Sequence, residues 1–496
     1  MTLLAHGADT LTRDALAVLQ PGFEGTTAPA WLLRQVGEGL TAVGLFGRNI
    51  TSPGQVAALT AQLRAERDDV LVAIDEEGGD VTRLEVRGGS SFPGNLALGA
   101  VDDTGLTRDV ARELGRRLAE CGVNLNWAPS ADVNSNPDNP VIGVRSFGAD
   151  TRLAARHTAA YVEGLQAAGV AACTKHFPGH GDTNVDSHHA LPRIDADLDT
   201  LAARELVPFK AAIAAGTKAV MSAHILVPAL DPTRPATLSP QILTGLLRKE
   251  LGYEGLIVTD GMEMNAIAGT YGIERGSVLA IAAGADAICV GGGLADEATV
   301  LRLRDALVAA VREGALPAER LADAAARVRE LASWTRQARA AAAPGAPQEG
   351  SAPGIGLAAA RRALVVTGAA GPVSAPYVAT LAPVANIAVG DETPWGVAAE
   401  LAALVPGTAS GVFPEGATAA DVLAAAGERT VVMVVRDAHR HPWMAAALEA
   451  LVEARPETVV VEMGVPRAEP RGALHIATHG ASRVCGRAAA ELIAGI

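Results

Sequence analysis

Short apolar runs alternate with amphipathic stretches along the first two thirds of this chain. The runs predict buried strands, at Ala42–Phe46, Val70–Ile74, Val123–Trp127, Val170–Thr174, Ala219–Ser222, Leu256–Thr259 and Ala285–Val290. Apolar positions at helical spacing between the runs predict helices, over Gln55–Arg67, Thr107–Cys121, Ala154–Ala168, Leu198–Ala215, Pro240–Lys249 and Ala295–Glu313. Because no hairpin signals separate the runs, this order indicates parallel strands joined by helical crossovers.

An eighth strand is expected in the weakly patterned N-terminal region, so residues 1–339 are predicted to form a (β/α)8 TIM-like barrel. The stretch 340–356 is rich in Pro, Gly and Ser, which is typical of a linker. A second strand and helix rhythm over 357–496 predicts a smaller α/β sandwich domain. Its strands are expected at Ala363–Thr367, Ile387–Val389, Val431–Val435, Val459–Glu462 and Leu474–Ile476, and its helices over Pro394–Leu404, Ala419–Ala426, Pro442–Ala454 and Ala481–Ala494.

Composition narrows the possible classes of protein. Hydrophobic residues make up 49% and charged residues 19%, which excludes a disordered chain. The net charge of −14 argues against nucleic acid as a partner, because phosphate binding needs Lys and Arg patches. We find no basic leader and no apolar run of membrane-spanning length, so no membrane span is expected. The four Cys residues (121, 173, 289 and 485) form no CxxC pair, which favours a reducing, cytoplasmic location.

Polar residues follow most of the predicted strands at once. They are Arg48-Asn49, Asp75-Glu76-Glu77, Asn126 to Pro129, Lys175-His176, His224, and Asp260 to Glu263. Barrel active sites are built at the carboxyl ends of the strands, where these side chains would converge. Loops are polar in any protein, but that explains poorly a Lys-His pair and an Asp each placed one step past a buried strand.

The segment 175–189 packs one Lys, four His and two Asp into fifteen positions. Within it, the spacing of Asp186 and His188 lets a carboxylate orient an imidazole for proton transfer. A single His in a loop is more often a hydrogen-bonded surface residue, and a metal site is a second alternative. The segment has no H-E-x-x-H spacing and no paired Cys, which disfavours metal.

Asp260 ends an apolar run, where a carboxylate can attack an anomeric carbon and form a covalent glycosyl intermediate. The alternative for an Asp after a strand is a helix cap. The general acid that this chemistry needs would be His188, held by Asp186.

Four further side chains fit the recognition of sugar hydroxyls, namely Asp75, Arg145, Lys175 and His176. Asp75 has the alternative of a helix cap or an ion pair with Arg83. Arg145 has the alternative of a surface ion pair with Asp138 or Asp150.

Several stretches together resemble glycoside hydrolase family 3, in particular its bacterial β-N-acetylglucosaminidase branch. They are Pro21 to Gly25, Leu45 to Ile50, Ile74 to Arg83, Val141 to Gly148, Lys175 to His188 and Val258 to Met264. The resemblance spans roughly residues 20–330 in the motif order of the family. It departs at Asp80, where a basic residue is expected in close relatives.

The resemblance implies roles for individual residues. Asp260 stands at the position of the nucleophile, and His188 at that of the acid/base, with Asp186 as its partner. Sugar-binding positions are matched by Asp75, Arg83, Arg145, Lys175 and His176. The C-terminal domain resembles the α/β sandwich that some members carry.

The sequence therefore predicts a retaining exo-β-N-acetylglucosaminidase that acts on terminal GlcNAc of peptidoglycan or chitin fragments, without a metal or organic cofactor. Three alternatives stay open. One is a phosphorylase that uses inorganic phosphate and releases a β-sugar 1-phosphate. Another is a broad enzyme that accepts both glucosides and N-acetylglucosaminides. The third is a catalytically inactive sugar-binding protein.

Overall fold

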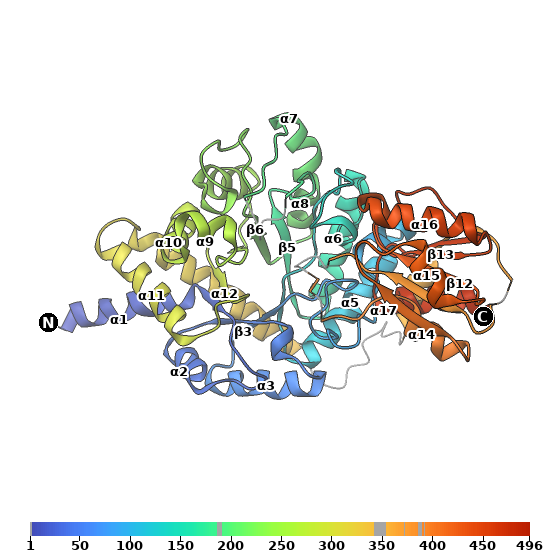
Figure 1. The fold of residues 1–496 in the computed structure, drawn as a ribbon. Coiled ribbons are helices and arrows are strands. Elements are labelled where there is room, and N and C mark those ends of the chain that lie inside the picture. The colour runs from blue at the N-terminus through green and yellow to red at the C-terminus, as the bar shows by residue number, and fades with distance from the viewer. Residues whose placement is uncertain (1, 186–190, 342–353, 372, 385–388, 391) are drawn as a thin grey trace. The chain divides into compact units, whose positions relative to one another are not determined.

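The structure, a computed structural model, describes residues 2–185, 191–341, 354–371, 373–384, 389–390 and 392–496 (Figure 1). The chain forms two compact units. Unit 1 consists of Met1–Glu76, Thr107–Val133 and Asp150–Ser351, and unit 2 of Glu77–Leu106, Asn134–Ala149 and Ala352–Ile496. Two segments of the N-terminal half, 77–106 and 134–149, thus fold with the C-terminal part of the chain. The division by sequence into domains 1–339 and 357–496, with a linker between them, stays a prediction.

Unit 1 is built on buried parallel strands. In its described part they are β1 (Leu19–Pro21), β2 (Ala42–Leu45), β3 (Leu71–Ile74), β4 (Leu125–Asn126), β5 (Ala171–Phe177), β6 (Ala219–Ser222), β7 (Leu256–Thr259) and β8 (Ile288–Val290). Strands β2 to β7 pair in chain order, and β1 pairs with β8. A bridge between Val258 and Ala287 connects β7 to the segment before β8. The predicted α/β fold with a parallel sheet is confirmed, and the strand expected near the N-terminus is β1.

Helices alternate with these strands. They are α1 (Thr2–Ala17), α2 (Ala30–Glu38), α3 (Pro53–Glu66), α5 (Thr104–Glu120), α6 (Thr151–Ala167), α7 (Leu198–Thr200), the π-helical η3 (Leu201–Glu205), α8 (Leu206–Ala214), the π-helical η5 (Gln241–Glu250), α9 (Asn265–Tyr271), α10 (Ile273–Ala283), α11 (Glu297–Arg312) and α12 (Ala318–Ala341). Ser52, Asp150 and Asp296 begin α3, α6 and α11, because each side chain accepts a hydrogen bond from the backbone N–H three residues further on.

The core of unit 1 follows from the two-residue period of the strands. Alternate side chains point to one cluster, as Leu71 and Ala73 do in β3, and Leu256 and Val258 do in β7. Helix α12 contributes Val328, Leu331 and Ala332 to the same cluster. The polar residues that follow the strands therefore stand beyond a packed apolar interior, at the carboxyl ends.

Unit 2 contains a sheet in the order β11-β10-β12-β13-β14-β9 within its described residues. Its strands are β9 (Val365–Gly368), β10 (Tyr377–Leu381), β11 (Ala409–Phe413), β12 (Val431–Val435), β13 (Val459–Glu462) and β14 (Leu474–Ala477). Only β9 runs antiparallel to its neighbour among these strands. Val432 and Val434 pack with α13 (Ile355–Arg362), α14 (Ala398–Leu404) and α17 (Arg483–Ala494). Met433 packs on the opposite face with α15 (Ala419–Ala426) and α16 (Pro442–Ala454), so helices cover both faces.

Most predicted elements are present, with two differences in unit 2. Strands β10 and β11 lie where no strand was predicted. The strand expected at Ile387–Val389 falls mainly on residues 385–388, outside the described residues, and Val389 lies in a turn. The four cysteines are buried free thiols. Among the described residues, no helix combines the length and the apolar character that a membrane crossing needs.

Candidate active site

The carboxyl ends of β3, β5 and β7 place three groups of polar side chains at one end of the sheet. Asp75 directly follows β3, and Asp260 directly follows β7. Lys175 and His176 are the two residues before the last residue of β5. The parallel pairing of β2 to β7 puts all of these ends on the same side. Four of the predicted site residues are thus held by alternate strands of one sheet in unit 1.

Lys175 and Asp75 form an ion pair, with Nζ 2.5 Å from Oδ1. The Lys175 side chain is only 2% exposed, whereas 26% of Asp75 is exposed. A buried ammonium is costly unless a carboxylate compensates it, so Asp75 accounts for the burial of Lys175. The exposed part of Asp75 leaves carboxylate surface that a sugar hydroxyl can reach.

Asp132 is a buried acceptor that sequence reasoning missed. Its carboxylate accepts from His176 Nδ1 at 2.7 Å, from the backbone N–H groups of His176 at 3.3 Å and His180 at 2.7 Å, and from Ser130 Oγ at 2.9 Å. Burial raises the pKa of Asp132, but His176 and the hydrogen bonds outweigh it and lower that pKa to about 2. Asp132 therefore stays ionised, and it fixes the orientation of the His176 ring.

The loop after β5, described up to residue 185, packs closely against the rest of unit 1. His180 is buried, and its Nδ1 lies 3.1 Å from Thr183 Oγ1. Burial, followed by the charge of His176, lowers the pKa of His180 to about 4, so this imidazole is neutral at neutral pH. The predicted acid/base His188 and its partner Asp186 lie outside the described residues.

Asp260 is half-buried at the end of β7, and its Oδ1 accepts a hydrogen bond from the backbone N–H of Gly261 at 2.8 Å. It does not cap α9, because Met264 occupies the N-cap position of that helix. Nearby, Glu263 accepts from the backbone N–H groups of Gly291, at 3.1 Å, and Gly292. Burial raises the pKa of Glu263, and the charge of Asp260 adds to this rise. The turn after β7 is thus tied to the turn after β8.

Arg83 and Arg145 belong to unit 2. Arg145 forms a two-pronged ion pair with Glu77, with distances of 2.7 Å from Nη2 to Oε1 and 3.0 Å from Nε to Oε2. Both side chains are buried, 7% and 3% exposed. Arg83 donates to the backbone oxygen of Val389 at 3.5 Å. The strong acceptor of Arg145 is therefore Glu77, which directly follows the Asp75-Glu76 pair in sequence.

Asp80, the position where the resemblance led us to expect a basic residue, has two partners in unit 2. Its Oδ2 lies 2.5 Å from Arg436 Nη2, and its Oδ1 accepts from the backbone N–H of Ala481 at 2.7 Å. The Arg436 guanidinium also lies 5.6 Å from the centre of the Trp395 ring. An acidic residue suits this position because the C-terminal part of the chain supplies the cation.

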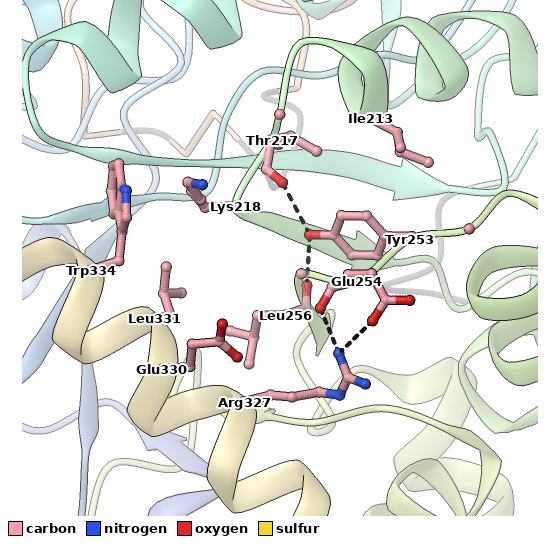
Figure 2. Close-up of a pocket in the computed structure, with 13 residues that line it drawn as sticks. Ile213, Thr217, Lys218, Tyr253, Glu254, Leu256, Arg327, Glu330, Leu331 and Trp334 are labelled. Atoms are coloured by element: carbon pink, nitrogen blue, oxygen red, sulfur yellow. Dashed lines mark hydrogen bonds and ion pairs between the residues drawn. The ribbon is translucent and has the colours of Figure 1, made fainter.

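A cavity of about 350 Å³ lies at the other end of the strands (Figure 2). It is lined by residues at the amino ends of β6 and β7 and by α12, among them Lys218, Tyr253, Leu256, Arg327, Glu330 and Trp334. Figure 2 shows Arg327 directed toward Glu254 and the Tyr253 hydroxyl bonded to the backbone next to it. Asp260, Asp75 and Lys175 lie at the opposite, carboxyl ends of their strands, so this cavity is not the candidate active site. In the described part of the chain, no cluster of three or more His, Cys, Asp or Glu residues could hold a metal ion.

Known proteins resemble this chain in sequence and in structure. A Beta-hexosaminidase A of Pseudoalteromonas piscicida is 37% identical over 324 residues, which cover 60% of this chain and 54% of that protein. The chain thus spans about half of that relative's length. A family 3 β-N-acetylglucosaminidase of Paenibacillus sp. str. FPU-7 is 35% identical, with a TM-score of 0.86 over 98% of this chain and 96% of that one.

A third likeness is to the NagZ structure of Neisseria gonorrhoeae in complex with N-trifluoroacetyl-D-glucosamine. It is 28% identical, with a TM-score of 0.56 over 70% of this chain and 96% of that one. The model of the glycosyl hydrolase family 3 N terminal domain matches residues 27–331. That match covers more than half of the sequence and contains Asp75, Lys175, His176 and Asp260. The chain therefore belongs to glycosyl hydrolase family 3.

Proposed function

We propose that this protein is a retaining exo-β-N-acetylglucosaminidase that hydrolyses terminal β-linked GlcNAc of peptidoglycan or chitin fragments. The observation that carries the proposal is the half-buried Asp260 carboxylate directly after β7, at the end of the sheet where Lys175 and Asp75 also lie. A carboxylate nucleophile beside groups that bind sugar hydroxyls is what retaining glycoside hydrolysis requires. We infer further that β1 to β8 constitute a (β/α)8 barrel and that unit 2 contains an α/β sandwich domain.

In the proposed first step, an Asp260 oxygen attacks the anomeric carbon and the glycosidic C–O bond breaks. His188 gives its proton to the departing oxygen, while Asp186 holds the imidazole in position. The products are a covalent glycosyl-Asp260 ester and a free alcohol. In the second step, His188 removes a proton from water, which attacks the same carbon and restores the Asp260 carboxylate. Two inversions leave the configuration unchanged.

The remaining predicted residues bind the sugar in this proposal. Asp75 accepts from hydroxyl groups, and its ion pair with Lys175 fixes the position of its carboxylate. His176, whose ring is fixed by Asp132, presents its other nitrogen to the sugar. Arg83 and Arg145 are proposed as further donors. Support for an N-acetylated sugar comes from the relatives, which include β-N-acetylglucosaminidases and a gonococcal protein in complex with a glucosamine derivative.

Phosphate as the acceptor in place of water is the second candidate. Its motivation is that His188, as an imidazole base, would not repel a phosphate dianion as a carboxylate base would. Lys175 and the His residues of the 175–180 loop would also favour an anion near the site. In the structure Lys175 is neutralised by Asp75, and the pKa of His180 is lowered to about 4, which weakens that argument. We therefore propose water as the main acceptor.

The deciding experiment is product analysis with chromogenic β-glycosides of GlcNAc and of glucose, with and without excess inorganic phosphate. We expect free GlcNAc of retained configuration at a rate that is indifferent to phosphate. A β-sugar 1-phosphate would establish the phosphorylase instead, and comparable rates on both sugars would indicate the broader enzyme. If neither glycoside is turned over, the result would favour the third alternative, a catalytically inactive sugar-binding protein.

A further inference from the structure

Glu205 is a fully buried carboxylic acid that the proposed mechanism does not use. It ends the π-helical segment η3, and its side chain is 0% exposed. Its Oε1 accepts a hydrogen bond from Arg204 Nε at 2.6 Å. Burial raises the pKa of Glu205 to about 7, while Arg204 opposes this rise and Asp132 and Asp182 add to it. Such a group is costly to bury, and π-helical turns are frequent at functional sites.

The backbone of the loop after β5 lies directly on this carboxyl group. Gly179 has a φ of +125°, and a Cβ at this position would stand 2.7 Å from Glu205 Oε2. On another side, a Cβ at Gly181 would stand 1.7 Å from the backbone oxygen of Val133. Both positions therefore require glycine, and the loop is packed tightly between Glu205 and Val133.

Arg204 extends this contact along the loop. Its Nη2 donates to Asp182 Oδ2 at 2.6 Å, while its Nε donates to Glu205. Asp182 precedes Asp186 by four residues. Together with the hydrogen bond from the His180 N–H to Asp132, this chain of contacts fixes residues 179–182 against unit 1.

We infer that Glu205 and Arg204 are positioning residues for the acid/base step, because they hold the segment from which the chain continues to Asp186 and His188. The inference rests on the proposed function. A displaced acid weakens proton donation to the leaving group, whereas attack by Asp260 is not affected directly. The loss should therefore depend on how much the leaving group needs a proton.

The test compares Glu205→Gln with the wild-type enzyme on two substrates, a dinitrophenyl glycoside and a GlcNAc disaccharide. We expect the disaccharide rate to fall roughly tenfold more than the dinitrophenyl rate, since a misplaced general acid loses only part of its effect. Asp182→Asn removes the other end of the contact chain at a more exposed position, 37% against 0%. Asp182→Asn should also lower the disaccharide rate more than the dinitrophenyl rate, but by a smaller factor. It provides the test if Glu205→Gln does not fold.

Asp286→Asn is the matched control. Asp286 is also a fully buried carboxylate paired with arginines, Arg248 and Arg320, in unit 1. It precedes β8, so it stands at the end of the strands away from the candidate site. Its replacement should reduce stability and change both substrate rates by the same factor. The same factor on both substrates in Glu205→Gln and Asp182→Asn would overturn the inference.

His188→Ala, measured alongside, separates this inference from the proposed function. If His188→Ala shows the leaving-group preference and the Glu205 and Asp182 variants do not, only the positioning role fails. If His188→Ala itself lacks the preference, the proposed acid/base assignment fails, and the positioning role fails with it.

Discussion

Asp132 Oδ2 lies 2.7 Å from Nδ1 of His176, and Asp132 also accepts the backbone N–H of His176. The two contacts fix both the ring and the backbone of a residue near the carboxyl end of β5. His176 can then present only its Nε2 to a ligand. The ionised, buried carboxylate of Asp132 thus holds side-chain and backbone groups of the candidate site in place.

Asp132→Asn should therefore impair catalysis although Asp132 itself touches no substrate in the proposal. The amide nitrogen of Asn donates and cannot accept, so the donors that face one of the two carboxylate oxygens lose their acceptor. The His176 ring or the 179–182 loop therefore shifts. We expect kcat/KM for a GlcNAc β-glycoside to fall by roughly a hundredfold, which is the usual cost of a displacement of about 1 Å. Steady-state kinetics on the folded variant, verified by circular dichroism, is the measurement.

Ser130→Ala is the control for this prediction. It removes one of the hydrogen bonds to Asp132, at 2.9 Å, and leaves the His176 contacts in place. Its effect on kcat/KM should be small. If Asp132→Asn were no worse than Ser130→Ala, Asp132 would have no organising role.

Asp260→Asn should remove the nucleophile with almost no change of shape. Only binding and electrostatic stabilisation would remain, so activity should fall by several orders of magnitude. A mechanism-based trap such as a fluorinated glycoside should label the wild-type peptide that contains Asp260 and leave the variant unlabelled in mass spectrometry. A folded Asp260→Asn enzyme that retains more than about a tenth of the wild-type activity would contradict the assignment.

His188→Ala should lower the rate much less for a dinitrophenyl glycoside than for a disaccharide. An acidic phenol leaves without protonation, whereas a sugar alcohol needs the acid. Asp186→Ala should show the same pattern more weakly, because the imidazole loses only its orienting partner. Presteady-state rates of glycosylation on both substrates provide the measurement. Equal losses on both would make His188 a binding residue.

The sequence predicted those elements whose hydrophobic pattern is local. Strands β6, β7, β12 and β13 have the predicted bounds because each is a continuous apolar run between clear breaks. Strand β11 was missed since it is a partly exposed edge strand with alternating burial. Strand β10 follows a Pro and contains Ala and Thr, so its composition resembles the surrounding loops.

The site was predictable only where its residues lie at the carboxyl end of a strand or directly after it. Asp75 and Lys175 are 100 positions apart, and each was placed correctly at a strand end, so their meeting follows from the parallel sheet. Asp132 stands in a stretch rich in Asn, Asp and Pro, where an Asp that forms turns and an Asp that orients a His look alike. The Asp80 pair with Arg436 joins positions 356 apart, and no local pattern encodes such a contact.

That pair yields a prediction for stability. Asp80→Ala should leave the Arg436 guanidinium, which is 12% exposed, without its carboxylate; the loss of one partner of a fully buried pair costs about 3–5 kcal/mol, which sets the upper limit here. The thermal midpoint of unfolding should drop clearly, and removal of Arg436 in the same protein should restore part of the loss. A double-mutant cycle over Asp80 and Arg436 measures this coupling.

Arg34 and Glu297 supply the comparison, since their ion pair has side chains that are 56% and 30% exposed. Exposed pairs contribute at most about 1 kcal/mol, so Glu297→Ala should scarcely change the midpoint. A coupling between Asp80 and Arg436 as small as that of the exposed pair would show that Asp80 does not anchor its segment.

The raised pKa of Glu205 leads to a prediction of how the stability of the protein depends on pH. Its pKa is raised from 4.5 to about 7, mainly by burial, so the folded state binds a proton more tightly than the unfolded state. Wild-type stability should therefore fall as the pH rises from about 4.5 to about 7, by up to roughly 3 kcal/mol from this group alone. In Glu205→Gln this fall should disappear, because the amide does not ionise.

The thermal midpoints of both proteins, measured between pH 5 and pH 8, give the comparison. Glu205→Gln should gain on the wild type with each step toward higher pH, because only the wild type must bury an ionised carboxylate there. The Gln side chain keeps an oxygen toward Arg204 but loses the charge that attracts the guanidinium, so the contact is weakened in the variant and not removed. A constant difference between Glu205→Gln and wild type across this range would mean that Glu205 is already ionised at pH 5, held so by Arg204.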